Sequence, residues 1–276
     1  MRKIPISVLV PTKNEGKNIF ACLSQLSSFD QVVVVDSSSK DSTQTIAEDF
    51  DIEFCDFKWN GEYPKKKQWA IQNIEFRNEW LLIIDADERI SEEFINELND
   101  FVSQDNFGID ALSVETDFYF SGHRLKYGHK STKVILIRLG KCWYQEIENF
   151  EEGGYFDVEL HYQPHVEGKI RKLKSRLLHG EETDLFSWLL KHLHYAEADA
   201  ISMLDSNSRK IMESHKSRKA QFFHKLPFKP LTFFVYSYVL KRGFLDGRMG
   251  LHYSIFMSSY FWLGKVLYSY KTMKRV

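Results

Sequence analysis

Two kinds of periodicity alternate along the first hundred residues, and this alternation limits the fold more than any other feature of the sequence. Short apolar runs, rich in β-branched residues where they are longest, occupy residues 6–10, 31–35, 52–54 and 80–84. Between the runs, apolar residues recur at helical spacing, as in Ile19, Leu23 and Leu26. Continuous apolar strands that alternate with amphipathic helices are typical of an α/β fold with a mostly parallel sheet covered on both faces.

Polar turns follow three of these four runs. They read Thr-Lys-Asn-Glu at 12–15, Asp-Ser-Ser-Ser at 36–39 and Asp-Ala-Asp-Glu at 85–88. Asp41 and Ser91, which come shortly after two of the turns, are suitable N-caps for the helices that follow. In open α/β sheets, ligands bind at the carboxyl ends of the strands. The sequence therefore predicts a ligand site where these three turns meet.

The pattern changes after about residue 110. Shorter mixed segments, including 111–120 and 134–139, continue to about residue 173, and a helical pattern follows from 183 to 215. We assign residues 1–180 to one α/β domain, in which 1–105 forms the ligand-binding half and 106–180 the second half. Residues 181–276 form a helical C-terminal region.

The C-terminal region is strongly basic, although the formal net charge of the whole chain is only −1. From Arg209 onward there are 14 lysines and arginines against two acidic residues, and aromatic residues are dense. Basic and aromatic residues together indicate nucleic acid or a membrane surface as the partner. The apolar runs 231–240 and 249–264 favour the membrane surface and argue against nucleic acid.

These two runs do not predict a transmembrane helix. The first is too short to span a bilayer, and the second contains His252 and several serines. We therefore expect helices that lie on the membrane surface, with cations such as Lys241 and Arg248 near anionic headgroups. The alternative is a basic helical subdomain that packs on the body of the protein.

Cysteine usage and the N-terminus indicate the compartment. The three cysteines, Cys22, Cys55 and Cys142, are odd in number and widely spaced, which argues against a disulfide framework and against a zinc site. Residues 1–6 lack the apolar segment of a secretory signal. We expect a cytoplasmic location.

The turn Asp85-Ala86-Asp87 is the strongest chemical signal in the sequence. A buried strand that delivers two carboxylates separated by one small residue suits a hard cation, Mg²⁺ or Mn²⁺, whose remaining ligands are phosphate oxygens and water. A solvated strand end is the alternative for such a short pattern. The apolar run before it and the two other polar turns favour the metal site.

Several motifs together resemble those of family 2 glycosyltransferases with the GT-A fold. The first three are Ile-Ser-Val-Leu-Val-Pro-Thr-Lys-Asn-Glu at 6–15, Val-Val-Val-Val-Asp-Ser-Ser-Ser-Lys-Asp-Ser-Thr at 32–43 and Asp-Ala-Asp at 85–87. Trp-Asn-Gly at 59–61, Pro-Lys-Lys-Lys-Gln-Trp-Ala at 64–70 and Gly-Phe-Leu-Asp-Gly at 243–247 extend the resemblance over nearly the whole chain. Within the family, the chain is similar to the branch that includes the lipopolysaccharide-core β-1,4-glucosyltransferases.

The resemblance implies a role for each residue that matches a motif. For the nucleotide-sugar donor, these residues are Pro11, Thr12 and Glu15 in the nucleoside pocket, Asp36 at the base, Asp85 and Ala86 near the ribose or pyrophosphate, and Lys67 near the leaving diphosphate. Asp87 would ligate the metal, and His179 would lie near the metal or the diphosphate. Carboxylates beside a diphosphate need a divalent cation between them, which agrees with this division.

Sugar transfer also needs a base that takes the proton of the acceptor hydroxyl. Glu159 is our first choice and Asp157 the second, with His161 beside them, and Glu146 and Glu148 are further candidates. The family's Val-His-Glu order is absent. Alignment on Gly168-Lys169 places Tyr162 where the glutamate would fall, and this leaves the choice of base open.

The sequence thus predicts an inverting hexosyltransferase. It would use UDP-glucose or a similar donor and a hydroxyl of a lipid-linked, lipopolysaccharide-type or capsule-type glycan, on the cytoplasmic face of the inner membrane. A sugar nucleotidyltransferase would favour a glycine-rich phosphate loop after the first strand, where only Gly16 is present. A non-catalytic nucleotide-sugar-binding scaffold at the membrane is the other alternative, favoured by the missing glutamate.

Overall fold

A computed structural model describes residues 3–145, 163–180, 184–204 and 228–274 of the chain. These residues form two compact units. Unit 1 contains the described residues up to Asp117, those from Ser131 to residue 145, and 163–180. Unit 2 contains Phe118–Lys130 and the described residues after 183.

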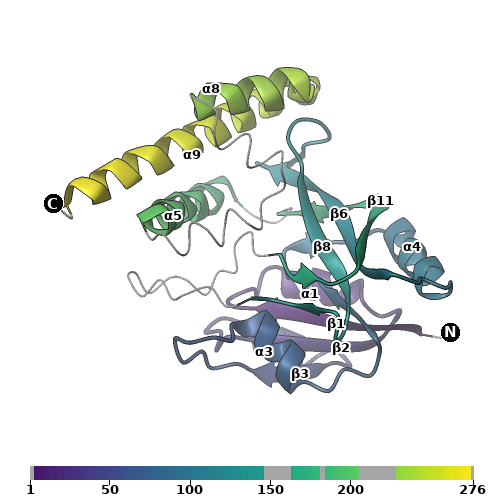
Figure 1. The fold of residues 1–276 in the computed structure, drawn as a ribbon. Coiled ribbons are helices and arrows are strands. Elements are labelled where there is room, and N and C mark those ends of the chain that lie inside the picture. Colours follow the sequence, from purple (N-terminus) through teal and green to yellow (C-terminus); the bar gives the residue numbers. More distant parts are fainter. Residues whose placement is uncertain (1–2, 146–162, 181–183, 205–227, 275–276) are drawn as a thin grey trace. The chain divides into compact units, whose positions relative to one another are not determined.

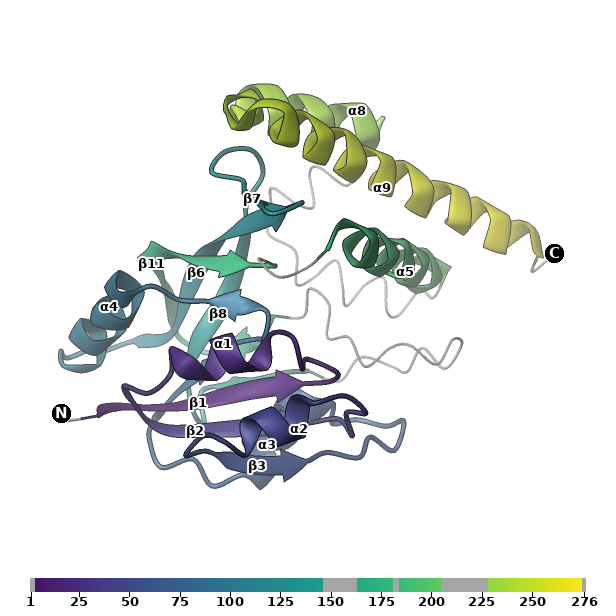
Figure 2. The ribbon, with the colours of Figure 1, turned by 180° about the vertical axis from the view of Figure 1, so that it is seen from behind.

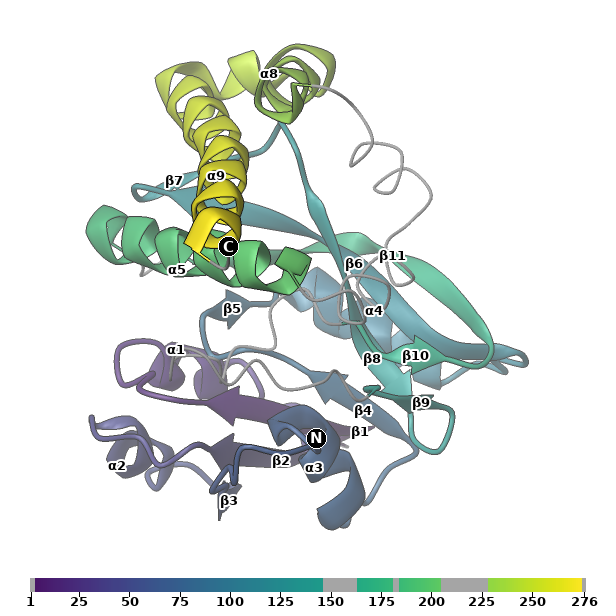
Figure 3. The same ribbon diagram turned by 60° about the vertical axis from the view of Figure 1, so that its left-hand side comes forward.

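A mixed β-sheet forms the centre of unit 1 (Figure 1). Four strands on one side are parallel: β1 (Ile4–Thr12), β2 (Phe29–Asp36), β3 (Glu53–Asp56) and β4 (Trp80–Ile83). The order continues through β8 (Ser131–Arg138), β6 (Ile109–Phe120) and β11 (Lys169–His179) to β5 (Glu88–Arg89). A separate ribbon pairs β9 (Cys142–Trp143) with β10 (His165–Val166) (Figure 3).

The strand runs expected in the first hundred residues are confirmed, but the expectation of a mostly parallel sheet is wrong for the second half. β8 runs antiparallel to both β4 and β6, and β5 runs antiparallel to β11. The segments 111–120 and 134–139 therefore do not make a separate layer. They continue the sheet beyond β4, so residues far along the sequence reach the edge at which β4 ends.

Helices cover both faces of the sheet, which explains why its parallel strands are apolar throughout. On one face, α1 (Ile19–Ser24) and α4 (Glu92–Val102) share a hydrophobic cluster with alternate residues of β1 such as Val8 and Val10. On the other, α3 (Lys66–Asn73) packs Ala70 against Leu9 and its neighbours. Figure 1 shows α3 in front of the sheet, and Figure 2, from behind, shows α1 in front.

The expected helix starts are partly confirmed. Ser91 is the N-cap of α4, and its Oγ accepts a hydrogen bond from the Phe94 N–H at 3.2 Å. The short helix α2 (Thr43–Ala47) begins after Ser42, so the expected N-cap Asp41 lies one residue too early. Asp41 instead accepts hydrogen bonds from the Thr43 and Gly16 N–H groups and ties the turn after β1 to the turn after β2.

The described residues of unit 2 form helices and a hairpin. Its helices are α5 (Leu185–Leu204), α8 (Lys229–Phe234) with the π-helical η1 (Val235–Leu240), the 3₁₀ turn η2 (Gly243–Asp246) and α9 (Gly247–Lys274). α5 and α8 both pack on α9 (Figure 3). The hairpin joins the end of β6 to β7 (His123–Arg124), and its Phe120 packs against Trp188 and Tyr253 with ring centroids 5.1 and 5.8 Å apart.

The Gly-Phe-Leu-Asp-Gly motif at 243–247 holds unit 2 together. The carboxylate of Asp246 accepts hydrogen bonds from the backbone N–H groups of Lys126 and Tyr127 at 3.0 and 2.9 Å. Gly243 and Gly250 allow two backbone segments to meet, since a Cβ on Gly250 would lie 2.0 Å from the Gly243 carbonyl oxygen. The motif that supported the family resemblance is thus structural in this unit.

Within the described ranges, no helix combines the length and the apolar character that crossing a bilayer requires.

Candidate active site

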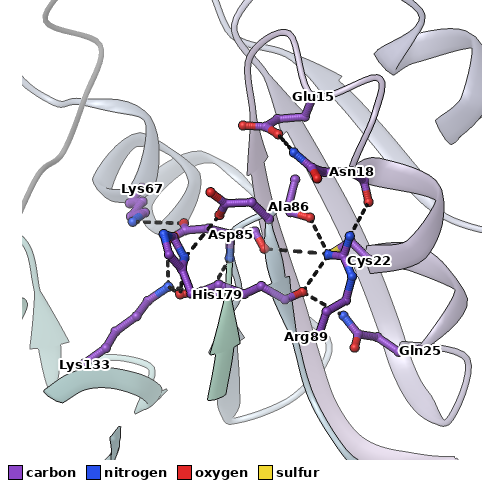
Figure 4. Close-up of polar contacts among 12 residues, drawn as sticks. Glu15, Asn18, Cys22, Gln25, Lys67, Asp85, Ala86, Arg89, Lys133 and His179 are labelled. Atoms are coloured by element: carbon purple, nitrogen blue, oxygen red, sulfur yellow. Dashed lines mark hydrogen bonds and ion pairs between the residues drawn. The ribbon is translucent and has the colours of Figure 1, made fainter. Parts of the chain in front are cut away.

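Charged side chains from four elements and one turn gather where β4 ends (Figure 4). The turn after β4 supplies Asp85 and Asp87, and β5 supplies Glu88. Around them lie three side chains that carry nitrogen, Lys67 from α3, Lys133 from β8 and His179 from the end of β11. Three carboxylates, two lysines and a histidine thus form one cluster.

Strand pairing explains why residues so distant in sequence meet here. Leu82 of β4 pairs with Leu136 of the antiparallel β8, and the same register continued by three residues brings Lys133 beside Asp85. His179 of β11 pairs directly with Glu88 of β5. The antiparallel half of the sheet therefore delivers both Lys133 and His179 to the turn after β4.

Lys133 lies between two of the three carboxylates. Its Nζ is 2.7 Å from Oδ2 of Asp85 and 2.8 and 2.7 Å from the two carboxylate oxygens of Glu88. Glu88 also accepts a hydrogen bond from the Asp85 N–H at 2.8 Å and donates its own N–H to the Asp85 carbonyl at 2.9 Å. The turn is closed from both ends, and its two outer carboxylates share the ammonium group of Lys133.

Charge and burial shift the pKa values of three groups in this cluster. Burial opposes ionisation of Asp85, but Lys133 and then Lys67 outweigh it and hold the pKa of Asp85 well below its ordinary value. Burial dominates at Glu88 and raises its pKa, although Lys133 opposes the shift. Burial would lower the pKa of Lys133, yet the charges of Asp85 and Glu88 raise it. Lys133 is therefore held as a cation and Asp85 as an anion.

Asp87 faces His179 on the other side of the turn. Oδ1 of Asp87 lies 3.4 Å from Nδ1 of His179, and the backbone carbonyl of Asp87 accepts a hydrogen bond from the Gly180 N–H at 3.1 Å. The Asp87 side chain is 10% exposed and that of His179 is 31% exposed. The nearly buried carboxylate of Asp87 in the turn is therefore paired with the more exposed imidazole of His179 at the end of β11.

This pair of donors fits Mg²⁺ or Mn²⁺ shared with a diphosphate. Among the described residues, no three side chains of histidine, cysteine, aspartate and glutamate lie close enough to hold a metal by themselves. Mg²⁺ is commonly bound by one or two carboxylates while substrate phosphates and water supply the other ligands. Asp87, with His179 beside it, matches that donor set, whereas Asp85 is occupied by two lysines.

The start of α3 adds positive charge to the same edge. Nζ of Lys67 lies 3.3 Å from Oδ1 of Asp85, so the sequence-predicted lysine does lie in the cluster. Its neighbour Lys66 is buried and donates a hydrogen bond from Nζ to the Thr12 carbonyl at 2.7 Å. The lysine run at 65–67 is thus divided between a charged role at Asp85 and an anchor on β1.

The predicted nucleoside residues lie at the ends of β1 and β2. Thr12 pairs with Asp36, and its Oγ1 donates a hydrogen bond to Oδ1 of Asp36 at 2.7 Å. The buried Asp36 carboxylate also accepts hydrogen bonds from the N–H and Oγ of Ser39. Leu9 pairs with Ile83, and the same register continued by two residues brings Pro11 beside Asp85. The two strand ends and the cluster therefore form one edge.

A second set of contacts holds the back of the turn against α1 (Figure 4). Arg89 donates hydrogen bonds from Nη1 to the carbonyls of Ala86 and Glu88 and from Nη2 to the carbonyl of Asn18. Asn18 donates from Nδ2 to Oε2 of Glu15 at 2.7 Å. Ala86 is buried, so its small side chain serves the packing of the turn. Glu15 is thus linked to the turn after β4 through Asn18 and Arg89.

Some predicted residues lie outside the described part of the chain, and some site residues were not predicted. The candidate bases Glu159, Asp157 and His161, with Glu146 and Glu148, all fall in residues 146–162, outside the described ranges. Lys133, Glu88 and Arg89 were not assigned roles from the sequence. The signal for Lys133 was its place directly before the mostly apolar segment 134–139, but its partner depends on the antiparallel pairing of that segment with β4.

Similar proteins point to one kind of enzyme. A lipopolysaccharide core biosynthesis glycosyltransferase, LpsC, of Rhizobium meliloti (strain 1021) is 23% identical over 266 residues, covering 91% of this chain and 90% of the relative. An uncharacterized glycosyltransferase of Rickettsia bellii (strain RML369-C) is 35% identical over 102 residues, which cover 37% of this chain and 34% of the relative. The match thus spans about a third of the length of the Rickettsia protein.

Solved structures give a partial match. Glucosyl-3-phosphoglycerate synthase from Mycobacterium tuberculosis, in complex with Mn²⁺, uridine-diphosphate and glucosyl-3-phosphoglycerate, is 19% identical, with a TM-score of 0.34. The match covers 43% of this chain and 44% of that chain.

The sequence model of the family described as Glycosyl transferase family 2 matches residues 7–165. This range is more than half of the 276 residues, and it runs from β1 past the Asp85-Ala86-Asp87 turn to β10. The chain therefore belongs to glycosyl transferase family 2.

Proposed function

We propose that this protein is an inverting glycosyltransferase that moves a hexose from a nucleotide-diphosphate sugar to a hydroxyl of a lipid-linked glycan. The observation that carries the proposal is the pair of Asp87 and His179 beside a lysine-balanced Asp85, at the sheet edge where β1 and β2 also end. Family membership supports transfer from an activated sugar.

The donor would lie along this edge. The ends of β1 and β2 would receive the nucleoside, with Pro11, Thr12 and Asp36 at the pocket and Glu15 beyond them. The diphosphate would lie at the turn after β4, where Lys67 and Lys133 keep Asp85 from repelling it, because both ammonium groups are already placed at its carboxylate. UDP-glucose or a similar donor is proposed from the family motifs.

Asp87 and His179 would hold Mg²⁺ or Mn²⁺ against the diphosphate. When bound, the cation neutralises the charge that develops on the leaving group. The protein's own part is positional. His179 pairs with Glu88, and the Gly180 N–H donates a hydrogen bond to the Asp87 carbonyl. These contacts hold both proposed metal ligands in place before the nucleotide sugar binds. A preorganised site of this kind needs little rearrangement during the reaction.

The proton of the acceptor hydroxyl would pass to a carboxylate of the 146–162 segment. Glu159 is proposed as this base, with Asp157 as the second choice and His161 as a further catalytic candidate that would contact the phosphate or the acceptor. Proton removal by a placed carboxylate makes the hydroxyl oxygen a better nucleophile for the anomeric carbon.

The acceptor is proposed to be a lipopolysaccharide-type or related envelope glycan. This proposal follows from the full-length similarity to LpsC, whose name places it in lipopolysaccharide core biosynthesis. An acceptor attached to lipid would lie at a membrane. We therefore propose that the protein works at the cytoplasmic face of the inner membrane as a peripheral protein.

A donor screen tests the activity. Purified protein is mixed with UDP- and GDP-sugars and a delipidated core oligosaccharide, with Mn²⁺, with Mg²⁺ or with a chelator, and release of the nucleoside diphosphate is measured. We expect release from one donor class that needs both acceptor and metal. Metal-dependent nucleotide binding without release from any donor would instead support a non-catalytic scaffold, which the absence of the family's glutamate at Tyr162 favours. Pyrophosphate release from a nucleoside triphosphate and a sugar phosphate would indicate a nucleotidyltransferase.

A further inference from the structure

The helix that runs through α8 and η1 is apolar on two opposite faces. One face packs inside unit 2, where Phe233 meets Phe261 of α9 with ring centroids 4.9 Å apart and the Ser237 Oγ accepts a hydrogen bond from the His129 N–H. The other carries Leu231, Val235 and Val239 at intervals of four residues, and these side chains are 65, 41 and 50% exposed. A helix that is apolar all round normally has a partner on every side.

Further exposed apolar side chains lie directly before and after these three residues in the chain. Phe228 precedes the helix and Leu240 ends it, and Phe244 and Leu245 of η2 follow, with exposed fractions between 46 and 76%. The ring of Phe244 lies 6.2 Å from that of Tyr238, which ties η2 to η1. We call the seven residues Phe228, Leu231, Val235, Val239, Leu240, Phe244 and Leu245 the apolar face. Seven exposed apolar side chains gathered in one short stretch of chain indicate an interaction site.

Cations border the residues of the apolar face in the sequence. Lys229, Lys241, Arg242 and Arg248 are supplied by the same stretch of chain. The one acidic residue of the described stretch 228–274 is Asp246, and both of its carboxylate oxygens accept backbone hydrogen bonds from the hairpin. The partner of this face is therefore expected to be apolar at its centre and anionic at its border.

An anionic bilayer has this chemistry. A second copy of the chain would set the bordering cations of one face against those of the other, which disfavours a symmetric dimer. Single-stranded nucleic acid is bound largely through stacking on aromatic side chains, whereas five of the seven residues of the apolar face are leucine or valine. Aliphatic side chains bordered by lysine and arginine are typical of helices that lie in the membrane interface.

We propose that the apolar face inserts into the boundary between headgroups and acyl chains of an anionic bilayer, with Lys229, Lys241, Arg242 and Arg248 at the headgroups. Docking would bring the active site to a lipid-linked acceptor, and in this respect the proposal rests on the proposed function. Docking itself requires no turnover, so the two are measured separately.

Vesicle binding by the full chain tests the proposal. Co-sedimentation is measured with phosphatidylcholine vesicles with and without phosphatidylglycerol. Wild type should bind the phosphatidylglycerol vesicles more tightly, and this preference should fall as salt is added. Leu231→Gln, Val235→Gln and Val239→Gln should each weaken binding by about tenfold, because each removes one apolar side chain from the lipid.

Matched variants separate the apolar and the charged contributions. Lys241→Gln with Arg248→Gln should remove most of the preference for phosphatidylglycerol while residual binding to phosphatidylcholine is kept. Phe107→Gln is the control, because Phe107 is an apolar residue of unit 1 with an exposed fraction of 95%. Its vesicle binding should equal that of wild type.

Two further measurements exclude misfolding and dimer formation as causes of weaker vesicle binding. Circular dichroism confirms that each variant is folded, and sedimentation velocity reports oligomeric state. Equal vesicle binding by wild type and the three glutamine variants would overturn the proposal, as would a dimer that these variants dissociate. Nucleoside diphosphate release with a delipidated acceptor is measured in parallel. If neither wild type nor any variant releases nucleoside diphosphate while vesicle binding follows the expected pattern, the proposed function fails and the docking surface stands.

Discussion

The ammonium nitrogen of Lys133 lies 2.7 Å from an oxygen of Asp85 and 2.7 Å from an oxygen of Glu88. This one contact links the antiparallel half of the sheet to the turn that carries the proposed metal ligand. It also balances two carboxylates that would otherwise repel both each other and a bound diphosphate.

Removal of Lys133 should therefore affect stability as well as donor binding. In Lys133→Met, Glu88 loses its cation while its side chain is only 3% exposed. We expect the free energy of unfolding to fall by about 3 kcal/mol or more, because a buried charge is left without its partner. Lys172→Met breaks an exposed pair with Glu115 and should cost less than about 1 kcal/mol. Urea denaturation of both variants checks this difference, and equal losses would contradict the buried role of Lys133.

Asp87→Ala should abolish metal-dependent nucleotide binding. The substitution removes the carboxylate proposed to hold the cation, while the backbone contact of Asp87 with Gly180 is kept. Calorimetric titration of UDP in the presence and absence of Mn²⁺ measures the effect, with Asp49→Ala, an exposed acidic residue of unit 1, as control. His179→Ala should weaken the same metal-dependent step. Undiminished Mn²⁺ dependence in Asp87→Ala would disprove the metal assignment.

Glu159→Gln should separate catalysis from donor binding. Loss of a general base lowers turnover by about 10² to 10⁴-fold while donor affinity is kept. Turnover and nucleotide affinity are measured on the same preparation, with Asp157→Asn beside it. If Asp157→Asn shows the large loss and Glu159→Gln does not, Asp157 is the base.

Gly250→Ala should destabilise unit 2. The added Cβ would lie 2.0 Å from the carbonyl oxygen of Gly243, and a backbone atom cannot move aside as a side chain can. We expect a loss of about 2 kcal/mol or more in the free energy of unfolding. Gly264→Ala is the matched control in the same helix, since its Cβ would meet no atom within 4 Å and alanine favours the helix. Thermal unfolding should show opposite shifts for the two variants.

Unit 2 should lose stability in mild acid because of His129. Burial, with smaller effects of Lys241 and Lys130, lowers the pKa of His129 from 6.5 to about 4. A depressed histidine pKa means that the unfolded chain takes up a proton first. The free energy of unfolding should therefore be unaffected above pH 6.5 and fall by roughly 1.4 kcal/mol per pH unit between pH 6.5 and 4.

The variant His129→Phe isolates this effect. Phenylalanine keeps the ring contact with Phe233, whose centroid lies 5.4 Å from that of His129, and removes the titrating group. The free energy of unfolding of wild type should therefore fall relative to that of the variant as the pH is lowered from neutral to 4.5. Parallel pH profiles for the two proteins would show that His129 does not contribute.

Local sequence patterns predicted the parallel half of the sheet because the apolar runs themselves require burial on both faces. Val33, Val34 and Val35 are all fully buried, and a run of this kind has few alternatives to a central strand. The turns at its carboxyl edge followed from the same reasoning. The direction of β8 could not be derived in this way, since a short mixed segment such as 134–139 can pair in either direction.

The candidate site shows the same division. Asp85 and Asp87 could be found because both lie directly after one strand. Lys133 could not, because its place beside Asp85 depends on the register of β8 with β4. His179 was expected only through the family resemblance. The pairing of β11 with β5 supplies the physical reason for its position.

The hydrogen bonds that Asp246 accepts from Lys126 and Tyr127 join residues 120 and 119 positions apart in the sequence. During synthesis, the hairpin Phe118–Lys130 leaves the ribosome long before η2 and α9 do. Its apolar Phe120 and Leu125 are buried in the folded protein. During synthesis they remain exposed to solvent until the residues of α9 that cover them have been made. A shortened protein that ends after unit 1's last strand would keep this hairpin permanently uncovered, and we expect such a product to aggregate rather than behave as an independent domain.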